Sequence, residues 1–249
     1  MSRKLTLLFL MLGICLLFLI LVELENQQRR HWVYHAALGS RIPPNYSVHG
    51  IDVSEYQKTV NWDKIKALRS HDTRLSFAFI RATMGESGKD DRFAENWRKC
   101  KQAGIIRGAY HYFRPYYKPD EQAAHFLRAA KMTKGDLPPT LDVEITDKVS
   151  PALLRKRVRI WLEEVEKVVK VRPILYSNYQ FYNDYLDGYF DDYPCWIAHY
   201  SAGRVNMRIG NSWTFWQYTD QGNISFIDHD IDLNVFQGSM EELKSLCID

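Results

Sequence analysis

Cysteine is scarce in this chain, with only four among 249 residues. Cys15 lies in an N-terminal apolar stretch, and the other three are Cys100, Cys195 and Cys247. Three cysteines cannot form a closed disulfide framework, and no Cys-x-x-Cys or other zinc-ligand spacing occurs. We therefore expect buried free thiols, with room for one optional disulfide, and no small disulfide scaffold. The length is instead sufficient for a full hydrophobic core.

Signatures of nucleotide and nucleic-acid binding are also missing. No Gly-x-Gly-x-x-Gly motif and no phosphate loop follows any apolar run. Lys and Arg together number 33 against 30 Asp and Glu, and the basic residues are scattered along the chain. An open doubly wound sheet is therefore disfavoured, and nucleic acid is not an expected partner.

The N-terminal region holds an apolar stretch that is long enough for a membrane anchor. Residues 5–22 carry no charge and follow Arg3 and Lys4. As a helix, such a stretch would span roughly 27 Å, close to the thickness of a hydrocarbon core. Because no small-residue cleavage site follows at once, we expect residues 1–23 to form an uncleaved transmembrane signal-anchor. Residues 24–47 are polar and irregular, which favours a tether.

From residue 48 onward, short apolar runs alternate with helix-like segments. Residues 151–169 show apolar positions at helical spacing after Ser150 and Pro151, as in a helix that covers a sheet. Repeats of about 25 to 35 residues indicate parallel strands joined by right-handed crossovers, and eight strands favour a closed barrel. We expect residues 48–249 to form an α/β fold, a (β/α)-type TIM-like barrel with about five β/α units followed by three further strands. The expected strands are residues 50–53, 76–82, 106–113, 140–143, 173–176, 195–198, 214–218 and 231–235.

Two carboxylate residues lie two positions apart at the end of the expected fourth strand. Period-two alternation places Asp142 and Glu144 on one face, roughly 6 to 7 Å apart at their Cα atoms. Active-site side chains of such barrels lie at the carboxyl ends of strands. Like charges this close raise the pKa of one group, and an acid beside an ionised carboxylate is what glycosidic cleavage requires. Asp-x-Glu is also common by chance, and a structural salt bridge is the alternative.

Two further carboxylates belong to the first and last expected strands. Asp52 ends the first strand and Asp232 lies in the eighth. These strands are neighbours in a closed barrel, so we expect both side chains to lie side by side, across the mouth from Asp142 and Glu144. The alternative is structural, with Asp52 forming a turn and Asp232 pairing with Asn234 in a loop. Glu144 is the expected acid because it lies further out and has the longer side chain.

Aromatic residues near the strand ends suit the walls of a sugar-binding cleft. Tyr110 and Tyr112 share one face of the third strand, with His111 as a further candidate. We expect substrate binding to depend mostly on Tyr112, Tyr176 and Trp216, while other aromatic residues belong to the core. Residues 228–232 include one His and three Asp, but the spacings that would indicate calcium or zinc are missing. No metal and no cofactor is therefore expected.

Eight short motifs, in a fixed order, together carry a family resemblance. The chain resembles the family 25 glycoside hydrolases, the Chalaropsis-type lysozymes, over everything except the anchor and the tether. The motifs are His49–Ser54 with Gln57, Phe79–Thr83, Gly108–Phe113, Leu141–Glu144, Tyr176–Asn178, Trp196–Ala198, Trp216–Tyr218 and Asp232–Asn234.

The resemblance implies an N-acetylmuramidase that cleaves the β-1,4 bond between N-acetylmuramic acid and N-acetylglucosamine. It implies that Glu144 is the general acid/base, that Asp142 stabilises or orients the acetamido group, and that Asp52 and Asp232 complete the acidic cleft. A direct nucleophile and attack by the substrate's own N-acetyl oxygen both remain open, with substrate assistance favoured.

The expected partners are peptidoglycan strands and, through the N-terminal helix, a membrane. A muramidase must reach peptidoglycan, so we expect a monomer with a single pass through the inner membrane and its catalytic domain on the periplasmic side. The alternatives are a non-catalytic glycan-binding wall tether and another barrel hydrolase, such as a metal-dependent polysaccharide deacetylase.

Overall fold

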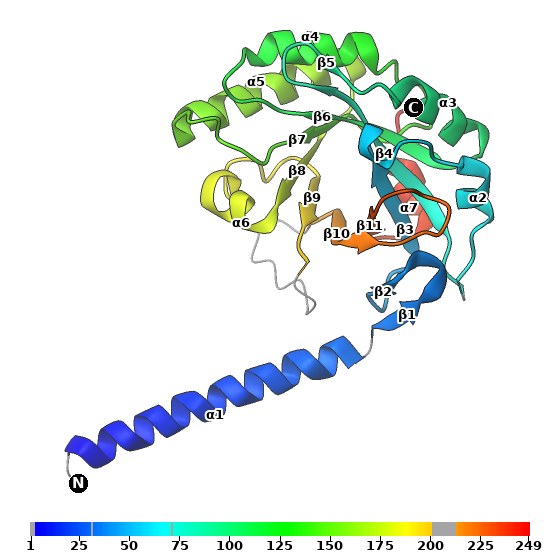
Figure 1. The fold of residues 1–249 in the computed structure, drawn as a ribbon. Coiled ribbons are helices and arrows are strands. Elements are labelled where there is room, and N and C mark those ends of the chain that lie inside the picture. The colour runs from blue at the N-terminus through cyan, green and yellow to red at the C-terminus, as the bar shows by residue number, and fades with distance from the viewer. Residues whose placement is uncertain (1–2, 31, 71, 201–212) are drawn as a thin grey trace.

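The computed structural model describes residues 3–30, 32–70, 72–200 and 213–249, and for the first helix it describes the side chains from 9 to 23. A closed barrel of eight strands forms its centre (Figure 1). A mixed α/β barrel is therefore confirmed, and each expected strand has a counterpart. In sheet order the strands are β3 (Val48–Val53), β4 (Leu75–Met84), β6 (Ile106–Tyr112), β7 (Thr140–Asp142), β8 (Ile174–Asn178), β9 (Cys195–Ala198), β10 (Phe215–Gly222) and β11 (Ile231–Phe236).

One antiparallel strand closes the barrel. The strands from β3 through β10 pair in parallel with their neighbours. Strand β11 instead pairs antiparallel with both β10 and β3. The expectation of parallel strands was wrong for β11, because residues 223–230 are too few for a crossover and only allow the chain to turn back. A short strand, β5 (Gly88–Lys89), pairs with the end of β4 outside the ring.

Helices on the outside of the barrel connect its first strands (Figure 1). Helix α5 begins after the capping side chain of Ser150 and buries Leu154, Val158 and Trp161, as the helical spacing predicts. The connection from β8 to β9 has only a short helix and a π-helical turn, so a division into five β/α units is not established. The helices are α2 (Trp62–Ala67), α3 (Phe93–Gln102), α4 (Pro119–Ala129), α5 (Pro151–Val169), α6 (Tyr179–Phe181), the π-helical turn (Tyr182–Leu186) and α7 (Met240–Leu246).

Large aromatic side chains fill the lower part of the barrel interior. Phe79 stacks on Trp196 with ring centroids 4.2 Å apart. Glycines on the neighbouring strands make room for these rings, since a Cβ on Gly50 would lie 2.4 Å from the ring of Phe77 and one on Gly108 would lie 2.7 Å from that of Phe79. The interior is therefore packed at this level, and the described residues leave a pocket toward the carboxyl ends of the parallel strands.

Part of the expected tether folds onto the barrel. β1 (Val33–His35) and β2 (Ser40–Ile42) form an antiparallel pair, joined by a 3-10 turn (Ala36–Leu38). The backbone N–H of Asn223 donates to the carbonyl oxygen of Leu38 at 2.8 Å. Gly39 allows this approach, because its φ is 59° and a Cβ would lie 2.5 Å from the carbonyl oxygen of Asn223. The segment is thus ordered here, while the domain boundary at residue 47 stays a prediction.

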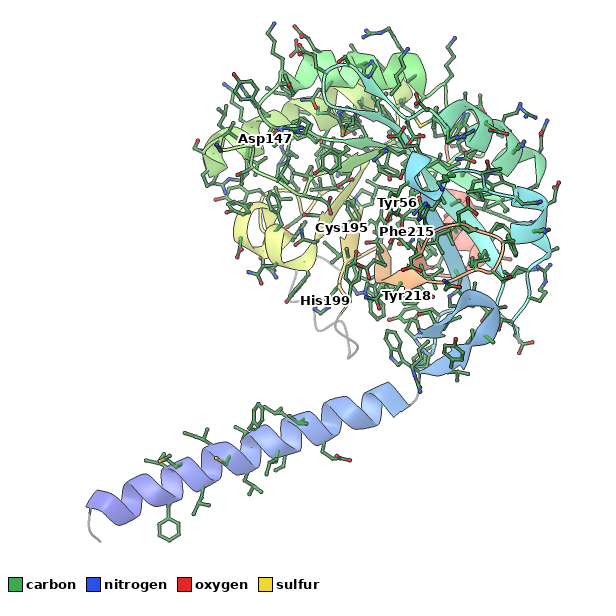
Figure 2. All side chains as sticks on the ribbon, in the orientation of Figure 1. Tyr56, Asp147, Cys195, His199, Phe215 and Tyr218 are labelled. Carbon is green, nitrogen blue, oxygen red and sulfur yellow. The ribbon has the colours of Figure 1, made fainter. Side chains whose placement is uncertain are left out.

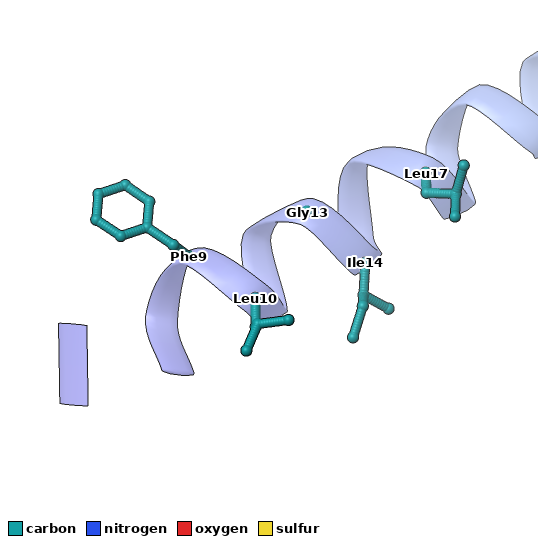
Figure 3. Close-up of a pocket in the computed structure, with 5 residues that line it drawn as sticks. All are labelled: Phe9, Leu10, Gly13, Ile14 and Leu17. Atoms are coloured by element: carbon teal, nitrogen blue, oxygen red, sulfur yellow. The ribbon is translucent and has the colours of Figure 1, made fainter. Parts of the chain in front are cut away.

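Helix α1 (Arg3–Arg30) extends away from the barrel (Figure 1). Among the residues with described side chains, no helix is both long and apolar enough to cross a membrane. The membrane anchor expected at residues 1–23 is therefore not supported. Figure 3 shows the residues that line a shallow pocket along this helix: Phe9, Leu10, Gly13, Ile14 and Leu17.

Candidate active site

A polar pocket opens where the parallel barrel strands end. Inward-facing residues alternate along each strand, so the last inward positions of several strands meet at this opening. The structure brings together there all four carboxylates that the sequence singled out, and it adds a fifth, Asp220 on β10. The four expected carboxylates are Asp52, Asp142, Glu144 and Asp232.

Asp52 and Asp232 are direct cross-strand partners, as the expected neighbourhood of the first and last strands requires. Oδ2 of Asp52 accepts hydrogen bonds from the side-chain amides of Gln217 and Asn234, each at 2.8 Å. These bonds lower the pKa of Asp52, although burial raises it more strongly. Burial and the adjacent charge of Asp52 raise the pKa of Asp232 to about 10, so Asp232 is the proton donor in its hydrogen bond to Asp52.

Asp142 and Glu144 face the same pocket from the end of β7. Burial raises the pKa of Asp142, and the charges of Glu144 and Asp52 raise it further. Oδ1 of Asp142 is buried and has no hydrogen-bond partner among the described residues. Burial and the charge of Asp52 also raise the pKa of Glu144, while a hydrogen bond from Tyr176 lowers it. Burial thus raises the pKa of each of the four expected carboxyl groups, and Asp52 also accepts two hydrogen bonds from side-chain amides.

Gln217 connects the two sides of the pocket. Its Oε1 accepts hydrogen bonds from the hydroxyls of Tyr176 at 2.9 Å and Tyr200 at 2.7 Å. Its Nε2 donates to Asp52, so these partners fix the orientation of the amide. The single proton of the Tyr176 hydroxyl has two acceptors in reach, Gln217 and Glu144. Tyr176 therefore couples Glu144 to the hydrogen bonds around Asp52.

Arg81 is the basic side chain among the described residues that line the pocket. Its Nε lies 3.0 Å from Oδ2 of Asp90, and its NH2 nitrogen lies 2.9 Å from Oε1 of Glu55. Two carboxylates outside the pocket therefore hold the guanidinium in place. From this position the charge of Arg81 lowers the pKa of Asp142, which opposes the effect of burial.

Several aromatic side chains form the walls, and two expected ones do not. Tyr110, Tyr112 and Tyr176 line the pocket. Trp196 also lines it, and its ring centroid lies 4.4 Å from that of Tyr176. These residues share inward-facing positions on β6, β8 and β9.

His111 and Trp216 lie outside the pocket, which corrects their expected place in substrate binding. His111 is fully buried behind the sheet, with Nδ1 2.7 Å from the hydroxyl of Thr83 and its ring stacked on Trp161. Nε1 of Trp216 donates to the carbonyl oxygen of His199 at 2.9 Å. Both residues occupy outward-facing positions, since each alternates with a neighbour that points into the barrel.

Four residues that line the pocket were not predicted from the sequence: Arg81, Tyr200, Gln217 and Asp220. The alternation of side chains along a strand could have identified two of them. Gln217 faces the opposite side from Trp216, and Arg81 continues the inward row of Phe77 and Phe79. Strand periodicity gives no such signal for Tyr200, which follows the end of β9, or for Asp220, because β10 changes register after Gln217. Within the described residues no group of three or more His, Cys, Asp or Glu is arranged to hold a metal ion.

Comparisons with known proteins point to one family. The family model of glycosyl hydrolases family 25 matches residues 51–227. The chain is 45% identical over 205 residues to a YegX protein of Escherichia coli strain K12, covering 82% of this chain and 75% of the relative. It is 33% identical over 213 residues to Lysozyme M1 of Streptomyces globisporus, covering 80% of this chain and 71% of the relative.

A solved structure agrees with this assignment. A family 25 glycosyl hydrolase from Bacillus anthracis superposes with a TM-score of 0.75 at 30% identity, over 86% of this chain and 97% of that one. The family match thus spans every residue that lines the pocket except Asp232. This chain belongs to glycosyl hydrolases family 25, and it is a glycoside hydrolase of the lysozyme type.

Proposed function

We propose that this chain is an N-acetylmuramidase that cleaves the β-1,4 bond between N-acetylmuramic acid and N-acetylglucosamine in peptidoglycan. The convergence of Glu144, Asp142, Asp52 and Asp232 in one pocket carries the proposal. The similarity to Lysozyme M1 supports a polysaccharide of the cell wall as the substrate.

Glu144 is the proposed general acid and base. Its raised pKa keeps the carboxyl group protonated closer to neutral pH, so that it can donate a proton to the oxygen of the leaving sugar. After the bond breaks, the resulting carboxylate can remove a proton from the incoming water. Glu144 is half-buried at the pocket wall, so burial can raise its pKa while its carboxyl group still reaches solvent.

Asp142 is the proposed partner of the substrate's acetamido group. Its buried Oδ1 lacks a hydrogen-bond partner among the described residues, and such an atom is costly to leave unpaired. An acetamido N–H that donates to this oxygen would satisfy it and would direct the acetyl oxygen toward the anomeric carbon. This arrangement favours substrate assistance over a direct protein nucleophile.

Asp52 and Asp232 provide a fixed negative charge near the reacting sugar. The amides of Gln217 and Asn234 hold Asp52 in place, so little reorganisation is needed when positive charge develops on the sugar ring. Tyr110, Tyr112 and Tyr176 are the proposed walls against which the sugar packs.

Replacing Glu144 by Gln tests this assignment. We expect Glu144→Gln to lower kcat on purified peptidoglycan by about 100-fold or more, because loss of a general acid costs on this order. Glu163→Gln is the matched control, since Glu163 is exposed on α5, and it should keep its activity. Near-full activity of Glu144→Gln, with an unchanged melting temperature, would remove Glu144 from the mechanism.

The proposed substrate also constrains where the domain acts. Peptidoglycan lies outside the cytoplasmic membrane, so we place the catalytic domain on the periplasmic or other extracytoplasmic side. Attachment to a membrane through α1 is not part of this proposal, and a monomeric state stays a prediction.

A further inference from the structure

An exposed tyrosine, Tyr56, and a partly buried histidine, His229, form an aromatic pair on the rim of the barrel, outside the pocket. Tyr56, labelled in Figure 2, belongs to the turn Glu55–Gln57 that follows β3, and its side chain is 64% exposed. Its ring lies 4.8 Å from that of His229 at an interplanar angle of 35°. His229 belongs to the loop that precedes β11. One face of the Tyr56 ring is thus supported by His229.

The register of β3 and β11 places this pair near the acidic site. Asp52 and Asp232 are cross-strand partners, and the chain continues outward from them at the mouth. Tyr56 follows Asp52 by four positions, so its Cα lies no more than about 14 Å away, at roughly 3.4 Å per residue. Tyr56 does not line the pocket that holds the carboxylates, so it lies outside the position of the sugar at the cleaved bond. A sugar further along the same glycan strand is within its reach.

The turn that carries Tyr56 is held on both sides. Ser54 and Gln57 form a capping box, and Nε2 of Gln57 donates to the carbonyl oxygen of Asp230 at 3.0 Å. Glu55 forms an ion pair with Arg81, which itself lines the pocket. A ring that is already fixed in place loses little conformational entropy when a ligand stacks on it.

We propose that Tyr56, backed by His229, is an outer subsite that stacks on an N-acetylhexosamine ring of the glycan strand, beyond the sugars at the cleaved bond. The inference rests on the proposed function, because it assumes that a glycan polymer enters the pocket. A sugar ring presents an apolar C–H face, and an exposed aromatic ring on a rigid turn is suited to contact that face.

The length of the substrate gives the direct test. The full chain and its variants are assayed on long glycan strands and on a tetrasaccharide of alternating N-acetylglucosamine and N-acetylmuramic acid. We expect Tyr56→Ala to lower the ratio of kcat/KM for long over short substrate by roughly 3- to 10-fold, through a higher KM for long strands. Tyr56→Phe keeps the ring and should restore most of this ratio.

Tyr189→Ala is the matched control. Tyr189 is also exposed, at 52%, but it packs under the guanidinium of Arg155 on α5, outside the pocket. Its removal should leave the ratio at the wild-type value. An unchanged ratio in Tyr56→Ala would overturn the proposal. An equal loss on both substrates would overturn it too, because Tyr56 would then act at the cleaved bond.

A binding measurement separates this proposal from the proposed function. If the wild type cleaves neither substrate, the muramidase assignment fails, but the subsite can still be tested by sedimentation with insoluble peptidoglycan. In the Glu144→Gln background, Tyr56→Ala should raise the apparent Kd by roughly 3- to 10-fold. Equal binding with and without the Tyr56 ring would refute the outer subsite.

Discussion

Asp232 and Asp52 face each other across two antiparallel strands, and the amide donors of Gln217 and Asn234 reach only Asp52. This asymmetry decides which group holds the proton, because a carboxylate that accepts several hydrogen bonds stays charged more easily. Asp232 then acts as the donor between them. The pair can therefore keep one negative charge in the pocket without placing two adjacent charges in a buried site.

The raised pKa of Asp232 predicts a pH-dependent effect of its removal. In the unfolded chain Asp232 ionises near its ordinary pKa of about 3.9, whereas in the folded chain it keeps its proton to higher pH. Its contribution to stability is thus complete below about pH 4 and is lost as pH rises toward the folded pKa. Asp232→Asn still donates to Asp52 but does not titrate. Its melting temperature relative to the wild type should rise between pH 4 and pH 8, and a difference that is constant or falls would contradict this assignment.

The hydrogen bond between Tyr176 and Glu144 predicts a shift in the pH profile of activity. This bond lowers the pKa of Glu144, so Tyr176→Phe should raise that pKa. The general acid would then stay protonated to higher pH, and the alkaline limb of kcat/KM would move to higher pH. Tyr218→Phe makes the same change on the outward face of β10 and should leave the limb in place. A shift to lower pH in Tyr176→Phe would show that Tyr176 does not donate to Glu144.

At the level of single residues, alternation predicted the carboxylates better than the aromatic walls. Asp142 and Glu144 were placed on one face by spacing alone, and both line the pocket. Trp216 was assigned to the wrong face because a single apolar strand does not reveal which of its faces is interior. The bond from Gln217 to Asp52 settles the question, but it joins residues 165 positions apart.

The N-terminal hairpin, formed by β1 and β2, packs against β10 on one side of the barrel. The ring of Trp32 lies 5.7 Å from that of Trp216 and 5.9 Å from that of Tyr218, which is labelled beside the hairpin in Figure 2. These contacts are on the outward face of β10, while the inward face carries Gln217. Packing of the hairpin therefore supports the strand that holds the hydrogen bonds of the pocket.

Removing the Trp32 ring should destabilise the domain. We expect Trp32→Ala to lower the free energy of unfolding by about 3 kcal/mol, because a large buried ring is lost. Tyr34→Ala changes an exposed aromatic residue of the same hairpin and should stay within about 0.5 kcal/mol of the wild type. Denaturant unfolding measures both variants. An equal free energy of unfolding for Trp32→Ala and Tyr34→Ala would show that the hairpin does not support the barrel.

The strands and helices of the barrel could be predicted where an apolar run in the sequence marks them directly. All eight barrel strands have a counterpart in the expected set, and α5 follows its helical spacing. β1 and β2 have only three residues each, which is too short for a periodic signal. The direction of β11 depends on how the barrel closes, and closure is a property of all the strands together.

At the scale of the whole molecule, three charged side chains of the pocket have hydrogen-bond or ion-pair partners within the protein. Asp52 is bound by amides, Glu144 by a tyrosine and Arg81 by two carboxylates. We therefore expect activity on peptidoglycan to survive dialysis against a chelator. Loss of activity that a divalent cation restores would favour the alternative of a metal-dependent barrel hydrolase.

The identity of the cleaved bond distinguishes a muramidase from the alternative hydrolases. The direct measurement incubates the full chain with purified peptidoglycan, reduces the products with borohydride and identifies the reduced end sugar by mass spectrometry. A muramidase leaves reduced N-acetylmuramic acid at the new ends, and we expect this product from the wild type and not from Glu144→Gln. Reduced N-acetylglucosamine, or released acetate without new reducing ends, would contradict it.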